Sequence, residues 1–259
     1  MNRGLTRQVL SVLAAIVTIG FNGVANALPL NNLTTGEISD RFKVYFTPAG
    51  YVFSIWGLIY LGIIAFAIYQ ALPAQRSNPR LERIGLPFVL SCLANIAWLF
   101  LWHYEYFLLT LIAMFGLLLC LIAVYVRLGI GRVTVPVAER WLVHVPFSIY
   151  LGWVSVASIA NTTIVLDYLR WDGWGLAPEW WALVMLLIGV GLALAMALTR
   201  RDVAYVLVFI WAYVGIAVKQ SALSIVARGA WITTALLTLV LIWAVLVNIR
   251  LIKPFKSVG

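Results

Sequence analysis

Charged residues are scarce in this sequence. They make up only 10% of its 259 residues, while hydrophobic residues make up 64%, and the mean hydropathy is +1.01. Soluble globular domains carry about 25% charged residues. The composition therefore excludes an ordinary soluble domain and indicates a polytopic membrane protein. No polar segment is long enough to fold as a separate soluble domain.

Groups that bind metals or carry out catalysis are also few. The chain has two histidines, His103 and His144, and two cysteines, Cys92 and Cys120. Neither histidine has a second ligand at metal-site spacing, so we expect no metal centre. The cysteines stand in apolar runs, which favours small buried side chains over a disulfide or a redox role. There is no Gly-rich phosphate loop and no Ser–His–Asp order, and no carboxylate is expected inside the helices. Neither a conventional enzyme nor proton-coupled transport is therefore indicated.

Eight apolar windows are long enough to cross a bilayer. They cover residues 8–30, 48–71, 86–103, 106–126, 140–165, 178–199, 203–222 and 229–250. We therefore predict an all-α polytopic membrane protein with eight transmembrane helices.

The basic residues predict the orientation of these helices. The net charge of +9 is spread over short loops rather than gathered in one patch, so it does not predict nucleic-acid binding. With eight helices both termini lie on one side. Five of the 18 basic residues fall on the other side: Arg41, Lys43, Arg170, Lys219 and Arg228. Because positive charge accumulates in cytoplasmic loops, both termini are expected in the cytoplasm, with the protein in a bacterial cytoplasmic membrane.

The first apolar run has two interpretations. A basic start, the apolar stretch 9–19 and the small-residue segment 25–27 together resemble a signal peptide. Its cleavage would leave seven helices. Gly20 and Gly23, in contrast, put small residues near one face, which suits close packing against another helix. We favour a retained helix, and cleavage of residues 1–27 stays open.

Composition divides the chain into two parts. Residues 31–47, NNLTTGEISDRFKVYFT, form the longest polar segment and are expected to cross the extracytoplasmic face before Pro48 restarts a helix. The sixth run, 183–198, has no aromatic and no polar side chain, as expected of a helix that faces lipid on most sides. We therefore predict a five-helix bundle, residues 1–171, and a three-helix C-terminal extension, residues 172–259.

Lys219 ends the seventh apolar run and invites comparison with the retinal-binding lysine of rhodopsins. No carboxylate is expected in the helices as its counter-ion. We therefore expect its side chain to extend to the membrane interface instead.

An aromatic stripe repeats on three of the predicted helices. Its members are Phe53, Trp56 and Tyr60 on the second helix, Asn95, Trp98 and Trp102 on the third, and Tyr150, Trp153, Ala157 and Asn161 on the fifth. Their spacings keep each set on one helix face. The alternating helix directions allow the three indoles of Trp56, Trp98 and Trp153 to share the outer half of the membrane.

The stripe has two interpretations, a ligand cavity or plain packing. An indole N–H or a side-chain amide in hydrocarbon needs a partner, so these groups should face protein rather than lipid. Small residues such as Gly57 and Ala157 beside large rings leave space. Trp56 is therefore predicted to line an apolar, aromatic cavity that opens toward residues 31–47. The alternative is a stripe buried as core packing, which is what helical spacing of aromatic residues more often indicates.

Three segments resemble motifs of the TspO family of translocator proteins, also called tryptophan-rich sensory proteins or peripheral benzodiazepine receptors. TPAGYVFSIWGLIY, residues 47–60, is similar to the start of the family's second helix. ANIAWLFLW, residues 94–102, is similar to its Leu-Asn-x-x-Trp motif, and WVSVASIAN, residues 153–161, to its fifth-helix motif. The resemblance covers the five-helix part of the chain.

The resemblance implies a five-helix bundle, usually dimeric, with a ligand pocket capped by the first loop. Family members bind porphyrins, haem, sterols and synthetic benzodiazepine-type ligands. Carried over by motif, the residues of the pocket would be Trp56, Asn95, Trp153 and Ala157. Arg41 or Lys43 would meet a propionate at the mouth, and His103 is a weaker candidate for an axial haem ligand. Val165 to Arg170, with Tyr168 between, match the family's proposed sterol-contact pattern.

The sequence departs from the family pattern at two places on these helices. Ile149 stands where the family usually has a proline, and the nearest proline is Pro146. Tyr51 stands where tryptophan is common, and we still count it among the ligand-binding candidates.

Together these observations predict a membrane receptor or sensor that binds a flat hydrophobic ligand. The ligand class implied by the resemblance is a tetrapyrrole, porphyrin or haem, or a sterol. No cofactor is required, and light-dependent porphyrin degradation, which the resemblance also implies, does not make the protein a true enzyme. Two alternatives stay open: a transporter of porphyrin-like or other hydrophobic molecules, and a structural or assembly protein without a ligand. The expected partners are a small hydrophobic ligand, the lipid bilayer and a second copy of the chain.

Overall fold

The computed structural model describes residues 3–27 and 30–252, and every regular element in these ranges is helical. The long helices are α1 (Arg3–Ala27), α3 (Ile55–Ala71), α4 (Pro79–His103), α5 (Phe107–Leu128), α7 (Val145–Tyr168), α8 (Pro178–Arg200), α9 (Val203–Lys219) and α10 (Ser224–Ile252). Short elements join them: η1 (Leu30–Asn32), α2 (Thr35–Asp40), η2 (Gly50–Ser54), η3 (Pro73–Gln75), α6 (Val137–Glu139), the π-turn η4 (Arg140–His144) and η5 (Gly173–Gly175).

Seven of the described helical segments are long and apolar enough to cross a membrane, and α9 is a shorter apolar helix. The predicted eight-helix membrane architecture is confirmed. The third span begins at Pro79 rather than at residue 86, and the eighth begins at Ser224 rather than at residue 229. In the fifth span α6, η4 and α7 follow one another without interruption from Val137 to Tyr168.

Local chemistry explains several of these boundaries. The side chain of Asn78 accepts a hydrogen bond from the Arg80 N–H at 3.0 Å and so caps α4. Helix α5 ends at Leu128 and is capped by Gly129, whose φ of 68° is the left-handed conformation that glycine adopts without strain. The π-turn closes through a bond from Val145 N–H to the Arg140 carbonyl, just before Pro146, which has no N–H to donate.

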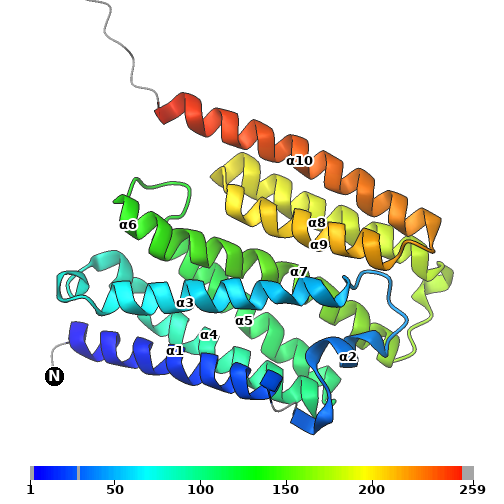
Figure 1. Cartoon of the computed structure of the whole chain (residues 1–259), viewed down its shortest axis with the longest axis horizontal. Helices are drawn as coiled ribbons and strands as arrows, with labels where there is room; N and C mark the ends of the chain where they lie inside the picture. The colour runs from blue at the N-terminus through cyan, green and yellow to red at the C-terminus, as the bar shows by residue number, and fades with distance from the viewer. Residues whose placement is uncertain (1–2, 28–29, 253–259) are drawn as a thin grey trace, which may run out of the picture.

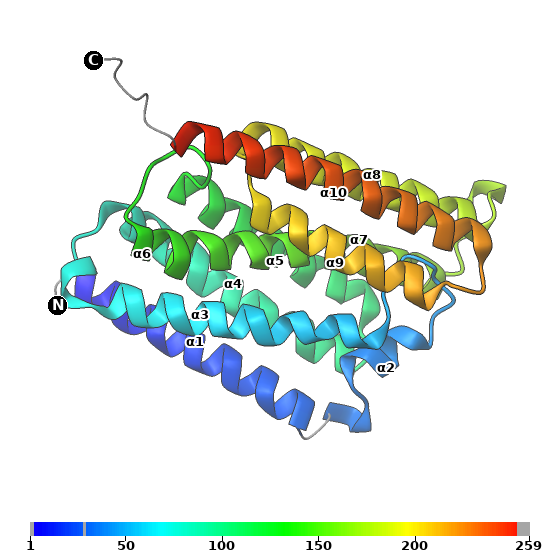
Figure 2. The ribbon, with the colours of Figure 1, turned by 45° about the horizontal axis from the view of Figure 1, so that its top comes forward.

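The helices run side by side along one long axis (Figure 1). Helix α4 contacts α1 and α5, while α7 contacts α3 and α5, which gives the five-span bundle. Helix α9 packs on α7, and α8 and α10 pack on α9. In both views α1 begins and α10 ends at the same end of the molecule (Figure 2).

The last three helices pack closely on the bundle. The indole N–H of Trp211 donates to the Val52 carbonyl at 3.1 Å, and Ala49 N–H donates to the Gly215 carbonyl at 3.1 Å. A Cβ at Gly215 would lie 2.1 Å from a methyl carbon of Val52. Only glycine therefore allows α9 and η2 to approach this closely.

Two carboxylates are buried between the helices. The expectation of none inside the helices is wrong for Glu139, which lies in α6, whereas Asp202 is the N-cap of α9. Glu139 is 1% exposed and accepts two hydrogen bonds from the Arg80 guanidinium, at 2.6 and 2.8 Å. Asp202 is 7% exposed and accepts hydrogen bonds from the hydroxyls of Tyr125 and Ser148, both at 2.7 Å. Each acid stands one residue before a window predicted from hydropathy, but the folded chain buries it with its donors.

Candidate functional site

An aromatic cavity of about 500 Å³ lies beneath α2, between α1, α3 and α4. Residues of α2 and its N-cap form one wall, and aromatic side chains of η2, α3 and α4 form another. The lining residues are Asn22, Thr34, Thr35, Gly36, Glu37, Asp40, Gly50, Phe53, Trp56, Gly57, Tyr60, Trp98 and Leu99.

A capping box folds α2 at this place. The Thr34 hydroxyl accepts from the Glu37 N–H at 3.2 Å, and the Glu37 carboxylate accepts from the Thr34 N–H at 2.7 Å. The Thr34 hydroxyl lies 2.7 Å from the same carboxylate oxygen. Stabilisation of the anion by the Thr34 backbone N–H, and next by its hydroxyl, lowers the pKa of Glu37 below its ordinary value.

Four contacts hold the segment around α2 against the rest of the fold. Lys219 of α9 forms a salt bridge with Asp40, and Arg41 forms another with Glu105 at 2.5 Å. The Trp102 indole N–H donates to the Thr35 carbonyl at 3.2 Å, and the Asn31 amide donates to the His103 carbonyl at 3.2 Å. Glu105 and its hydrogen bonds raise the pKa of Arg41. Lys219 thus pairs with a carboxylate from the first loop, and its extension to the membrane interface stays a prediction.

The aromatic residues around Trp56 form one contiguous cluster. Trp56 stacks on Tyr60 at a centroid distance of 5.7 Å. It makes edge-to-face contacts with Tyr150 at 6.1 Å and with Trp153 at 6.4 Å, and Trp153 contacts Phe53 at 5.8 Å. These geometries are the favourable ones for aromatic pairs. The aromatic stripes of the second and fifth predicted helices therefore meet behind the cavity wall.

A chain of side-chain hydrogen bonds crosses the bundle next to this cluster. The Tyr60 hydroxyl donates to Asn22 Oδ1 at 2.7 Å, and the Asn22 amide donates to Asn95 Oδ1 at 2.8 Å. The Asn95 amide then donates to the Tyr150 hydroxyl at 3.2 Å. The chain links helices α1, α3, α4 and α7, and it satisfies buried polar groups that lipid cannot satisfy.

A second set of polar bonds fixes Trp98. Its indole N–H donates to Asn161 Oδ1 at 2.9 Å, and the Asn161 amide donates to the Thr110 hydroxyl at 2.9 Å. Trp98 also stacks on Trp102 at 5.5 Å. The predicted stripe on α4 is therefore held rigidly where it borders the cavity.

Trp153 differs from Trp98 in one respect. It is 2% exposed, and its Nε1 has no hydrogen-bond partner within the described residues. A buried N–H without an acceptor is costly and uncommon. The Trp153 ring contacts Phe53 and Trp56, which both line the cavity.

The predicted site residues fall into three groups. Phe53, Trp56, Tyr60 and Trp98 line the cavity. The buried residues Asn95, Trp102, Tyr150, Trp153 and Asn161 support the lining ones, and the half-buried Ala157 packs against the core. Tyr51, Arg41 and Lys43 are exposed, and Tyr51 contacts Trp211 at 5.5 Å. A ligand contact for any of these residues stays a prediction.

The sequence-based list of site residues omits Asn22, Glu37, Asp40 and Lys219. Asn22 could have been found as an amide side chain inside an apolar run. That run also resembles a signal peptide, which gives no reason to assign its residues to a site. The order Thr-x-x-Glu at positions 34 to 37 is a recognisable capping box. The pairing of Asp40 with Lys219 joins distant parts of the chain, and no local pattern predicts it.

Comparison with known protein families gives one match. The family described as TSPO-like protein matches residues 8–243. The chain belongs to the TSPO-like protein family. No curated protein and no solved structure matches it. The match runs from α1 into α10, so it includes helices from both predicted parts of this TSPO-like chain, and the division at residues 171 and 172 stays a prediction.

Proposed function

We propose that this TSPO-like protein binds a flat hydrophobic small molecule in the aromatic cavity, for sensing, sequestration or handover. The observation that carries the proposal is the cavity itself, which combines four aromatic side chains with a polar wall from α2. Its volume of about 500 Å³ falls in the range of roughly 300–1,000 Å³ usual for small-molecule sites. Membership of the family supports a role in ligand binding or sensing.

A tetrapyrrole is the ligand class that we propose first. Rings of Phe53, Trp56 and Trp98 offer stacking surface to a flat aromatic molecule. Tyr60, held by Asn22, offers a fixed polar edge. Light-dependent degradation of a bound porphyrin and dimerisation of the protein are further proposals that the family resemblance supports.

The charges at the cavity also favour a second candidate, a neutral flat ligand such as a sterol. Glu37 and Asp40 are lining residues, and Lys219 balances only Asp40. Carboxylates near the ligand repel a propionate, so a porphyrin would have to direct its propionates toward Arg41 or Lys43. Arg41 is already bound to Glu105.

The test titrates the purified full chain in nanodiscs with protoporphyrin and with its neutral dimethyl ester, and follows quenching of tryptophan fluorescence. Saturable binding that weakens by roughly tenfold in Trp56→Phe/Trp153→Phe is the expected result. Trp174→Phe is the matched control, because Trp174 is 77% exposed and lies outside the cavity. Tighter binding of the ester would favour the neutral ligand class.

Two results would contradict the proposal. Absence of saturable binding by either compound would support a structural or assembly role, with the stripe as packing. Flux of the compound across proteoliposomes, abolished by Trp153→Ala, would support a transporter that uses the same cavity.

A further inference from the structure

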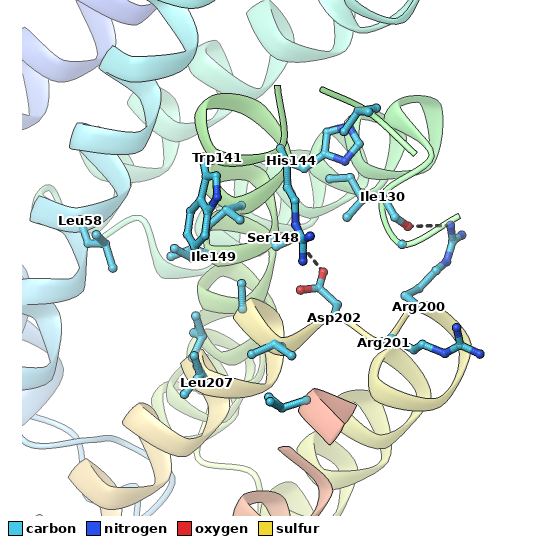
Figure 3. Close-up of a pocket in the computed structure, with 18 of the residues that line it drawn as sticks. Leu58, Ile130, Trp141, His144, Ser148, Ile149, Arg200, Arg201, Asp202 and Leu207 are labelled. Carbon is cyan, nitrogen blue, oxygen red and sulfur yellow. Dashed lines mark hydrogen bonds between the residues drawn. The ribbon is translucent and has the colours of Figure 1, made fainter. Parts of the chain in front are cut away.

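A second, larger cavity lies on the other side of α3, where α3, α7 and α9 meet the loop 130–135. Its volume is about 1100 Å³. Figure 3 shows residues from these elements around it, with Ser148 and Asp202 between Trp141 and Arg200. It shares no lining residue with the aromatic cavity. It is therefore a separate site, which the proposed function does not use.

One part of this groove is apolar and faces outward. Among its lining residues Leu58 is 52% exposed, Leu207 is 47% exposed and Trp211 is 38% exposed. On α9 the lining runs from Val203 to Trp211, which is about 12 Å at about 1.5 Å per residue. That length is close to half of a hydrocarbon core about 30 Å thick. The groove therefore matches the depth of one leaflet of acyl chains.

The other end of the groove is strongly basic. Arg132 of the loop 130–135, Arg140 at the start of η4, and Arg200 and Arg201 at the end of α8 all line it. The guanidinium groups of Arg132 and Arg140 have no hydrogen bond or salt bridge within the described residues, although both backbone N–H groups are bonded. Arg200 donates to the Ile130 carbonyl at 3.2 Å and lies 5.6 Å from the centre of the Tyr125 ring, so it too lacks an acidic partner there.

Asp202 keeps its negative charge at this end and offsets only one of the four arginines. Its Oδ2 accepts from Tyr125 and Ser148, and its Oδ1 accepts from the Tyr205 N–H at 3.1 Å, which caps α9. These bonds stabilise the fold, and four lining arginines against one lining carboxylate leave this end with a net positive charge.

His144 adds an independent observation. It is 6% exposed and lines the groove, and its Nε2 has no hydrogen-bond partner in the described part of the chain. The nearest carboxylate oxygen, on Glu139, is 4.0 Å away, beyond hydrogen-bond distance. A buried nitrogen without a partner at a polar cavity wall indicates a site for a polar ligand group.

We propose that this groove binds one anionic phospholipid from the adjacent leaflet. The phosphate lies between Arg132 and Arg140, which offer charge-assisted hydrogen bonds. One acyl chain follows the apolar wall past Leu58 and Leu207. A zwitterionic lipid brings a positive group to the same arginines, so the site prefers a lipid with net negative charge.

The test measures lipid retention by the purified full chain. The protein is equilibrated in micelles with equal amounts of phosphatidylglycerol and phosphatidylcholine of identical acyl chains, and retained lipid is quantified by mass spectrometry. Wild type is expected to enrich phosphatidylglycerol, and Arg132→Gln/Arg140→Gln to reduce that preference by roughly tenfold. Arg83→Gln, an exposed arginine at the start of α4 outside the groove, is the matched control and keeps the preference.

A second variant tests the acyl-chain part. Ala204→Phe fills the groove and is expected to abolish retention, while Ala195→Phe, at an exposed position of α8 outside the groove, leaves it unchanged. Equal retention of the two lipids by wild type overturns the proposal, and so does displacement by inorganic phosphate, which would identify a free-anion site. These wild-type measurements decide the matter even where a variant does not fold. Binding of porphyrin is not measured, so this result stands apart from the proposed function.

Discussion

The ammonium group of Lys219, at the end of α9, forms a salt bridge with the carboxylate of Asp40 in α2. It also donates a hydrogen bond to the Thr47 hydroxyl at 3.1 Å. The two charged residues are 179 positions apart in the chain. Because Asp40 lines the aromatic cavity, the C-terminal helices help to hold one of its walls.

Replacing Lys219 tests whether this salt bridge controls access to the cavity. Asp40 and Lys219 have side chains 54% and 25% exposed, and a pair of this kind contributes at most about 1 kcal/mol to stability. Lys219→Gln is therefore expected to leave the melting temperature almost unchanged. It should speed ligand release about threefold, because α2 moves more freely. Stopped-flow recovery of tryptophan fluorescence measures the rate.

The matched control is Arg228→Gln, since Arg228 is an exposed basic residue of α10 outside the cavity. Asp40→Asn should reproduce the faster release, and the double variant Asp40→Asn/Lys219→Gln should add little to either single change. Additive effects of the two changes would show that the salt bridge does not govern release.

The capping box of α2 gives the site a dependence on pH. The pKa of Glu37 is lowered in the folded protein by its bonds from Thr34. The contribution of the box is thus complete above the ordinary pKa of 4.5 and is lost as the pH falls through the lowered value. Ligand affinity is expected to decline below about pH 4, measured by titration in acidic buffers.

Two substitutions separate this effect from general acid unfolding. Glu37→Gln keeps a side chain that can complete a capping box, so affinity should persist with a smaller pH dependence. Glu37→Ala removes the reciprocal bond and should weaken binding at neutral pH. If wild type and Glu37→Gln lose affinity in parallel on acidification, another group is responsible.

Much of the fold can be predicted from the sequence, because a bilayer can be crossed only by long apolar segments. A chain must supply about 20 apolar residues for each crossing, so the helices are visible as uninterrupted hydrophobic windows. The aromatic faces of α3, α4 and α7 are visible as well, since helical spacing alone places Trp56, Trp98 and Trp153 on single faces. The packing of those faces around a cavity depends on the neighbouring helices, and spacing cannot specify it.

The residues that sequence analysis misjudges stand at helix boundaries. Glu139 and Asp202 look like loop acids, because hydropathy windows begin one residue after each of them. In the structure Arg80 and Tyr125, from distant helices, supply the donors that allow these carboxylates to be buried. Such pairs join segments far apart in the sequence, so a window average carries no information about them.

The polar chain beside the cavity predicts non-additive effects on stability. Asn95→Leu removes the partner of the Asn22 amide and of the Tyr150 hydroxyl, and is expected to cost about 1–2 kcal/mol of unfolding free energy. Asn22→Leu should cost a similar amount. The double variant should cost less than the sum, because neither change then leaves the other amide unpaired.

Denaturant titration in mixed micelles measures these free energies. Thr163→Val is a suitable control, because among the described residues the Thr163 hydroxyl bonds only to the Ala160 carbonyl of its own helix, at 2.8 Å. Strict additivity of the two asparagine changes would show that the hydrogen bond between them contributes nothing to the fold.

Trp98 and Trp153 form a matched pair for separating a binding role from packing. The Trp98 N–H is bonded to Asn161, so Trp98→Phe leaves a buried acceptor unpaired and should cost about 1–3 kcal/mol. The Trp153 N–H has no partner among the described residues, so Trp153→Phe loses no hydrogen bond. The loss of unfolding free energy in Trp153→Phe should therefore be smaller, because it comes only from the removed part of the indole ring.

Ligand titration of the same two variants completes the comparison. If the aromatic cluster serves binding, Trp153→Phe should lower the affinity for the ligand several-fold although it hardly changes stability. The reason is that the substitution alters the edge contacts that orient Trp56 and Phe53. If the cluster is only packing, affinity should follow stability, and Trp98→Phe should be the more damaging change in both assays. A variant that keeps its fold and loses its ligand therefore distinguishes a cavity from a filled core.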